Sequence, residues 1–139
     1  MVSLYSDGNP RTISWAIRTP LETLLQRRAQ AGMYRDRITP MQARFVALHV
    51  GLFWGIGVFA VRNGGAVQFM IDDPAMMSYL ESRSSGDAFI DGRMRSIDLL
   101  IGQRSLDVSV YGIESSENVA TPLLERTGSA TNAVDAPSP

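Results

Sequence analysis

The sequence predicts an α+β domain in which two N-terminal helices precede a central apolar segment, C-terminal antiparallel β-strands and a disordered C-terminal tail. Three observations predict this order: two helix-start signals, a run at residues 45–61 without formal charge, and an alternating segment at residues 105–113. With 139 residues, of which 45% are hydrophobic, the chain can form one compact domain. We expect an irregular lead-in over residues 1–18, a single α+β domain over 19–126 and a disordered tail over 127–139.

Both predicted helices begin at the same kind of signal. Residues 19–22 (TPLE) and 39–42 (TPMQ) each place Thr at the N-cap, Pro at the first helical position, and Glu or Gln three residues after the Thr. The first signal predicts an amphipathic helix that begins at Pro20, carries arginines on one flank and ends at Gly32. The second predicts a helix that begins at Pro40 and leads directly into the apolar run.

The apolar run, residues 45–61 (FVALHVGLFWGIGVFAV), has two interpretations. As one helix it is a marginal membrane span, since a bilayer core needs roughly 17 to 25 apolar residues. As a helix followed by a strand, it is the buried centre of a soluble domain, because three glycines each weaken a helix in water by about 1 kcal/mol and residues 62–65 (RNGG) favour a turn. The residues assigned to this membrane or core segment are Phe45, Leu48, His49, Leu52, Phe53 and Trp54.

Beyond the run, the sequence predicts β structure. Residues 66–71 (AVQFMI) follow the turn as a second apolar arm, and residues 105–113 alternate between apolar and polar side chains. Asp72 and Asp73 stand before Pro74, where an acidic side chain can cap a short helix. We therefore assign Asp72 a structural role.

The charge is distributed unevenly along the chain. All thirteen basic residues are arginine, and the chain up to residue 44 has a net charge of +4, whereas the chain from residue 45 onward has −5. If the run spans a membrane, this asymmetry predicts a cytoplasmic N-terminus. In either solvent, the arginines can form a face that meets phosphate. The candidate phosphate-binding residues are Arg27, Arg28, Arg35, Arg37 and Arg44.

Catalytic and metal-binding signatures are not recognisable in the sequence. Lysine and cysteine are absent, and the single histidine, His49, lies within the apolar run, where a buried structural histidine is the simpler interpretation. No phosphate-binding loop, dinucleotide fingerprint or nucleophile elbow occurs. The sequence therefore predicts a protein that is not an enzyme, with no catalytic residue, no cofactor and no metal.

Four segments together resemble the core of the plant-virus cell-to-cell movement proteins. They are residues 45–52 (FVALHVGL), 63–72 (NGGAVQFMID), 78–79 (SY) and 105–110 (SLDVSV). In that family, strands are punctuated by glycines and an Asp ends one of them. The resemblance implies a β-rich domain that binds single-stranded nucleic acid and associates with membranes, with Asp72 in the place of the family's Asp.

Two functional hypotheses follow. The first is a non-enzymatic, membrane-associated interaction protein whose arginine-rich N-terminal half meets phosphate-bearing partners, with movement-protein-like nucleic-acid binding as one form of it. The alternative is a soluble, cytoplasmic α+β assembly or binding module, such as a structural or accessory subunit of a larger complex. The expected partners are a membrane or a protein, nucleic acid through the arginine half, and further copies of the chain.

Overall fold

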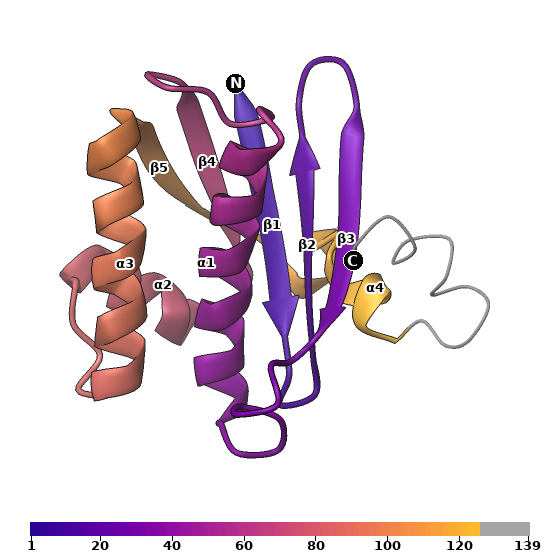
Figure 1. The fold of residues 1–139 in the computed structure, drawn as a ribbon, viewed down its shortest axis with the longest axis vertical. Coiled ribbons are helices and arrows are strands. Elements are labelled where there is room, and N and C mark those ends of the chain that lie inside the picture. The colour runs from indigo at the N-terminus through magenta and orange to yellow at the C-terminus, as the bar shows by residue number, and fades with distance from the viewer. Residues whose placement is uncertain (126–139) are drawn as a thin grey trace.

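In the computed structural model, residues 1–125 are described, and they form a five-stranded sheet with helices on both faces (Figure 1). The predicted tail, residues 127–139, lies outside the described residues. The elements in chain order are β1 (Val2–Gly8), β2 (Thr12–Arg18), β3 (Thr23–Ala29), α1 (Pro40–Gly57), β4 (Ala66–Ile71), α2 (Pro74–Ser82), α3 (Ala88–Arg104), β5 (Asp107–Gly112), η1 (Ser115–Glu117) and α4 (Thr121–Leu124).

The sheet is mixed, with the strand order β3-β2-β1-β4-β5. The first three strands are antiparallel neighbours, while β1, β4 and β5 run parallel to one another. Helices α1 and α3 lie side by side in front of the sheet in Figure 1, and the main core lies between them and the sheet. A smaller cluster around Tyr5, Ala16 and Ala120 fills the opposite face beneath α4.

The predicted N-terminal helix and irregular lead-in are wrong, because strands come first. Residues 12–18 (TISWAIR) alternate so that Ile13, Trp15 and Ile17 face α1, and the strand is buried on both faces. The TPLE signal at residues 19–22 forms the β2–β3 turn instead of a helix start. The Thr19 hydroxyl accepts hydrogen bonds from the backbone N–H groups of Leu21 and Glu22, so the same residues satisfy a turn as well as they would satisfy a helix.

The second helix start is confirmed, and the apolar run is helical almost to its end. Thr39 and Gln42 form a reciprocal capping box at the start of α1. The helix continues through Gly51 and Gly55 because both glycines face the sheet. A Cβ at Gly55 would lie 2.7 Å from the Ile17 side chain, so the missing side chains let α1 pack closely on β2.

The run therefore lies in the core of the domain and has no strand exit. Phe45, Leu48 and Leu52 are completely buried, whereas His49 and Trp54 are partly buried and Phe53 is 64% exposed. No helix in residues 1–125 combines the length and the apolar character that crossing a bilayer requires. The membrane-spanning interpretation of the run is wrong.

The predicted antiparallel β portion is also wrong. Residues 107–112 do form the expected strand, but β4 and β5 are parallel, and the crossover between them contains α2 and α3. Asp73, as predicted for this junction, caps α2 by accepting hydrogen bonds from the N–H groups of Ala75 and Met76. Asp72 has a different partner, described below.

Gly8 allows the end of β1 to approach the first turns of α1. A Cβ at Gly8 would lie 2.6 Å from the carbonyl oxygen of Ala43, a backbone atom that cannot rotate away. We expect Gly8→Ala to lower the free energy of unfolding by about 1–3 kcal/mol in urea denaturation. Gly57→Ala is the control, because a Cβ there meets no atom within 4 Å and should not destabilise the protein. Equal stability of the two variants would contradict this packing.

Candidate functional site

The connectivity of the sheet marks one place as the candidate site. Strands β1 and β4 lie side by side and parallel, but the chain leaves β1 toward β2 on one side and leaves β4 toward β5 on the other. In sheets of this kind, ligands bind in the crevice outside the carboxyl ends of the strands where the strand order reverses. These carboxyl ends lie at the lower end of the sheet in Figure 1, where the arrow of β1 points.

Two carboxylates and one guanidinium meet at these carboxyl ends. Register pairs Tyr5 of β1 with Met70 of β4, and two residues further along each strand this places Asp7 opposite Asp72. Both Asp side chains are only 5% exposed. Arg44 reaches them from the second turn of α1, with Nη1 2.8 Å from Asp72 Oδ1 and Nη2 3.7 Å from Asp7 Oδ1. One arginine thus serves as the counter-charge of both carboxylates.

The remaining donors come from segments far apart in the sequence. The backbone N–H of Gly8 donates to Asp7 Oδ1 at 2.8 Å, and the Thr121 hydroxyl donates to Asp7 Oδ2 at 2.6 Å. The Asn118 side-chain amide donates to Asp72 Oδ2 at 3.2 Å. All four carboxylate oxygens therefore face a protein donor. We call Asp7, Arg44, Asp72 and Asn118 the central cluster.

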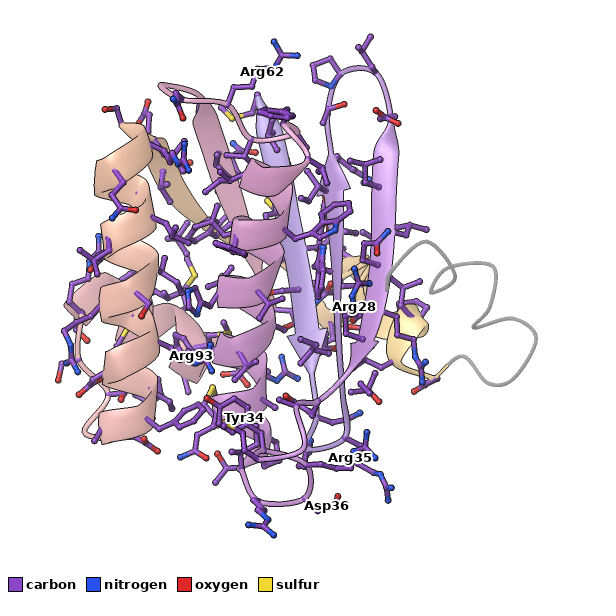
Figure 2. All side chains as sticks on the ribbon, in the orientation of Figure 1. Arg28, Tyr34, Arg35, Asp36, Arg62 and Arg93 are labelled. Atoms are coloured by element: carbon purple, nitrogen blue, oxygen red, sulfur yellow. The ribbon has the colours of Figure 1, made fainter. Side chains whose placement is uncertain are left out.

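Further arginines lie at the same end of the sheet. Arg11 is in the β1–β2 turn, and Arg35 and Arg37 are in the loop between β3 and α1; all three are exposed. Backbone hydrogen bonds tie this loop to the turn, including Asp36 N–H to the carbonyl of Pro10. Figure 2 shows Arg35 and Asp36 at this end and Arg62 at the opposite end. We call Arg11, Arg35 and Arg37 the arginine rim.

The other predicted phosphate-binding residues lie on β3. Arg27 and Arg28 are near its carboxyl end and point to opposite faces of the sheet, as alternate strand residues must. Arg28 lies over the Trp15 ring, with its guanidinium carbon 5.2 Å from the ring centroid, and donates to the Gln26 side chain at 2.7 Å. Of the five candidate arginines, Arg35, Arg37 and Arg44 lie at the same end of the sheet, and only Arg44 enters the central cluster.

A second cluster joins α3 to α1 and the β3–α1 loop. Arg93 of α3 donates to His49 Nδ1 and to the Tyr34 hydroxyl, both at 2.8 Å, and its guanidinium lies over the rings of Tyr34 and Phe89 (Figure 2). Because a guanidinium can only donate, His49 accepts through Nδ1 and is neutral. Burial lowers the pKa of His49, and the positive charge of Arg93 lowers this pKa further. His49 thus connects α1, through Arg93, to Tyr34 in the β3–α1 loop.

Comparison with known proteins identifies the fold. The structure is similar to RNase H1 from Halobacterium salinarum NRC-1, with a TM-score of 0.67 and 17% identity over 97% of this chain and 98% of that one. The N-terminal RNase H domain of a Mycobacterium tuberculosis protein gives a TM-score of 0.66 and 17% identity, over 97% of this chain and 94% of that chain.

A third match is LC11-RNase H1, an enzyme isolated from compost by a metagenomic approach and solved in complex with an RNA/DNA hybrid. It gives a TM-score of 0.67 and 14% identity, over 99% of both chains. No protein-family model and no curated protein matches the sequence. The chain therefore has an RNase H-like fold.

These matches overturn three predictions. The fold is that of RNases H and not that of plant-virus movement proteins. The prediction of a membrane-associated interaction protein is wrong, since the matched structures belong to proteins that process nucleic acid. The prediction that the chain is not an enzyme is contradicted as well, because the matched proteins are nucleases.

Nucleases commonly hold divalent metal ions between carboxylates, so the central cluster must be compared with that requirement. It offers two carboxylates, Asp7 and Asp72, and one amide, and the position between the carboxylates is taken by the Arg44 guanidinium. Residues 1–125 contain no group of three or more His, Cys, Asp or Glu side chains able to hold a metal. The residues present at this cluster do not fit a divalent ion.

The sequence analysis missed Asp7 and Asn118. Asp7 falls in the segment expected to be irregular, and Asn118 in a polar stretch with no motif. One signal for Asp7 is present: residues 2–6 (VSLYS) alternate between apolar and polar side chains, which indicates a strand before Asp7, as residues 66–71 form a strand before Asp72. Two strands that each end in a buried Asp would have suggested that the carboxylates meet at one edge of a parallel pair.

Removal of Arg44 should destabilise the protein. In Arg44→Met, two nearly buried carboxylates lose their shared counter-charge, and we expect the free energy of unfolding to fall by about 2–4 kcal/mol. Arg95→Met is the matched control, since Arg95 is exposed on α3 and its loss should change stability by about 0.5 kcal/mol or less. Chemical denaturation at neutral pH measures both, and similar values would argue against the ion-paired cluster.

The lowered pKa of His49 predicts a pH dependence. Between that pKa and the ordinary value of 6.5, the unfolded chain binds a proton that the folded chain does not, so stability decreases as pH falls below 6.5. His49→Gln removes this contribution, and the stability difference between wild type and variant should shrink on acidification, by at most about 1.4 kcal/mol per pH unit. Urea denaturation on both sides of pH 6.5 measures it. A difference that stays constant would contradict the assignment.

Proposed function

We propose that this chain is a nucleic-acid-binding domain that binds a duplex across the carboxyl ends of β1 and β4. The observation that carries the proposal is the placement of Arg44 at the strand-order reversal, with the arginine rim beside it. The RNase H-like fold supports it, since a matched enzyme was solved with an RNA/DNA hybrid. This proposal replaces the membrane-associated partner expected from the sequence.

The chemistry of these arginines suits a phosphate backbone. A guanidinium presents a planar fork of donors that matches a phosphate, and the Arg44 side chain retains 26% exposure while its ends are held by Asp72 and Asp7. Arg35 and Arg37 are exposed on a loop whose backbone is fastened to the β1–β2 turn. These arginines would contact phosphates and not base edges. Binding of a duplex should therefore depend weakly on its base sequence and strongly on salt concentration.

The loop itself is held in place by the second cluster. The Arg93 guanidinium lies over the face of the Tyr34 ring. The Tyr34 and Phe89 rings pack edge to face, with their centroids 5.4 Å apart. This contact anchors the loop to α3 from one side, while the hydrogen bond from Asp36 to Pro10 anchors it from the other. The rim arginines therefore have a fixed backbone and need to order only their own side chains on binding.

A charge-reversal pair tests the proposal. We expect Arg35→Glu/Arg37→Glu to weaken binding of a fluorescent RNA/DNA hybrid at least tenfold, a loss of about 1.4 kcal/mol, and to reduce the salt slope by about two. Fluorescence anisotropy at several salt concentrations gives both values. RNA and DNA duplexes of the same sequence, titrated in parallel, identify the preferred duplex.

The control is Arg62→Glu/Arg104→Glu, which makes the same charge change at the opposite end of the sheet, where both residues are exposed (Figure 2 for Arg62). It should retain most of the affinity, apart from the loss that its overall charge change produces. Equal weakening by the two double variants, or no measurable binding of any duplex by the wild type, would reject the proposed interface.

A further inference from the structure

The central cluster departs from the metal sites of nucleases in one specific way. The space between Asp7 and Asp72, where a divalent ion would meet both carboxylates, contains a side chain of the protein. Arg44 Nη1 lies 2.8 Å from one carboxylate and Nη2 lies 3.7 Å from the other. The guanidinium thus provides the positive charge that these two nearly buried carboxylates require.

Displacement of Arg44 by an ion would be unfavourable. The guanidinium is always charged, so it repels a divalent ion and cannot be neutralised by losing a proton. Its neighbours Ala43 and Phe45 are completely buried, and the carbonyl of Ala43 is packed against Gly8, so the backbone at residue 44 is fixed beside β1. The second oxygens of Asp7 and Asp72 already accept hydrogen bonds from Thr121 and Asn118.

We propose that Arg44 is the resident cation of this site and takes the place of a divalent metal ion. The wild-type pair Asp7 and Asp72 consequently does not bind Mg²⁺ or Mn²⁺ at concentrations near those of the cell. The inference rests on the ion-pair geometry and does not depend on nucleic-acid binding, because its test measures metal ions alone.

The same geometry predicts that one substitution creates a metal site. In Arg44→Glu, a third carboxylate replaces the guanidinium on a side chain that is shorter by about two bonds, which leaves room for an ion bound by oxygen at about 2.0–2.6 Å. Two or three convergent carboxylates with an adjacent amide are a ligand set suited to Mg²⁺ or Mn²⁺. The cluster would then change from one positive and two negative groups to three negative groups.

Electron paramagnetic resonance of free Mn²⁺ tests this inference, since bound ions lose the sharp signal. We expect the wild type to leave the signal close to that of buffer, and Arg44→Glu to bind Mn²⁺ at least about tenfold more tightly. The melting temperature of Arg44→Glu, measured in parallel, should rise with Mn²⁺ or Mg²⁺, while that of the wild type should not. The added substitution Asp72→Asn should abolish both gains.

Arg11→Glu is the matched control, because Arg11 also faces a carboxylate, Asp36 at 3.9 Å, but both side chains are exposed. It should gain no comparable Mn²⁺ affinity. If Arg44→Glu does not fold without metal, Arg44→Gln gives the same comparison with a neutral side chain and should bind Mn²⁺ more tightly than the wild type. Wild-type Mn²⁺ binding that Asp72→Asn abolishes, or folded position-44 variants that bind no better than wild type, would overturn the inference.

Discussion

Two carboxylates that are almost removed from water must share a counter-charge, and in this protein that charge is Arg44. Asp7 is the second-last residue of β1 and Asp72 follows β4, so the parallel pairing of these strands brings two negative charges together at one edge. An uncompensated buried charge costs several kcal/mol. The first turns of α1 lie over this edge, and Arg44 in these turns supplies the positive charge. Asn118 and Thr121 complete the hydrogen bonds and thereby fix the C-terminal segment on the opposite face. The cluster therefore joins four segments of the chain.

The rest of the core follows from the position of α1. This helix is covered by the sheet on one side and by α3 on another, so its composition is apolar over most of its circumference, as in a central helix or a membrane span. Two of the three glycines of the run lie where α1 approaches β2, with Gly51 close to Trp15 and Gly55 close to Ile17. They contribute close packing, and the helix stability that they cost is offset by burial.

The sequence predicted correctly the features that depend on interactions between neighbouring residues. The capping box at residues 39–42, the cap at Asp73 and the strand at residues 107–112 depend on neighbouring residues. The N-terminal strands were missed because the TPLE residues satisfy a β-turn through the same Thr hydroxyl that would cap a helix. The parallel pairing of β1, β4 and β5 was missed because no local pattern specifies it. The site depends on that pairing, so Arg44 was found as one of several arginines, without its carboxylate partners.

In this RNase H-like fold, an arginine lies between two carboxylates, where we propose that it takes the place of a metal ion. The most direct measurement is a crystal structure of the wild-type protein grown with Mn²⁺, with an anomalous difference map calculated at the central cluster. The account predicts a guanidinium between Asp7 and Asp72 and no anomalous peak there. A manganese peak bridging the two carboxylates, with the Arg44 side chain displaced into solvent, would contradict it.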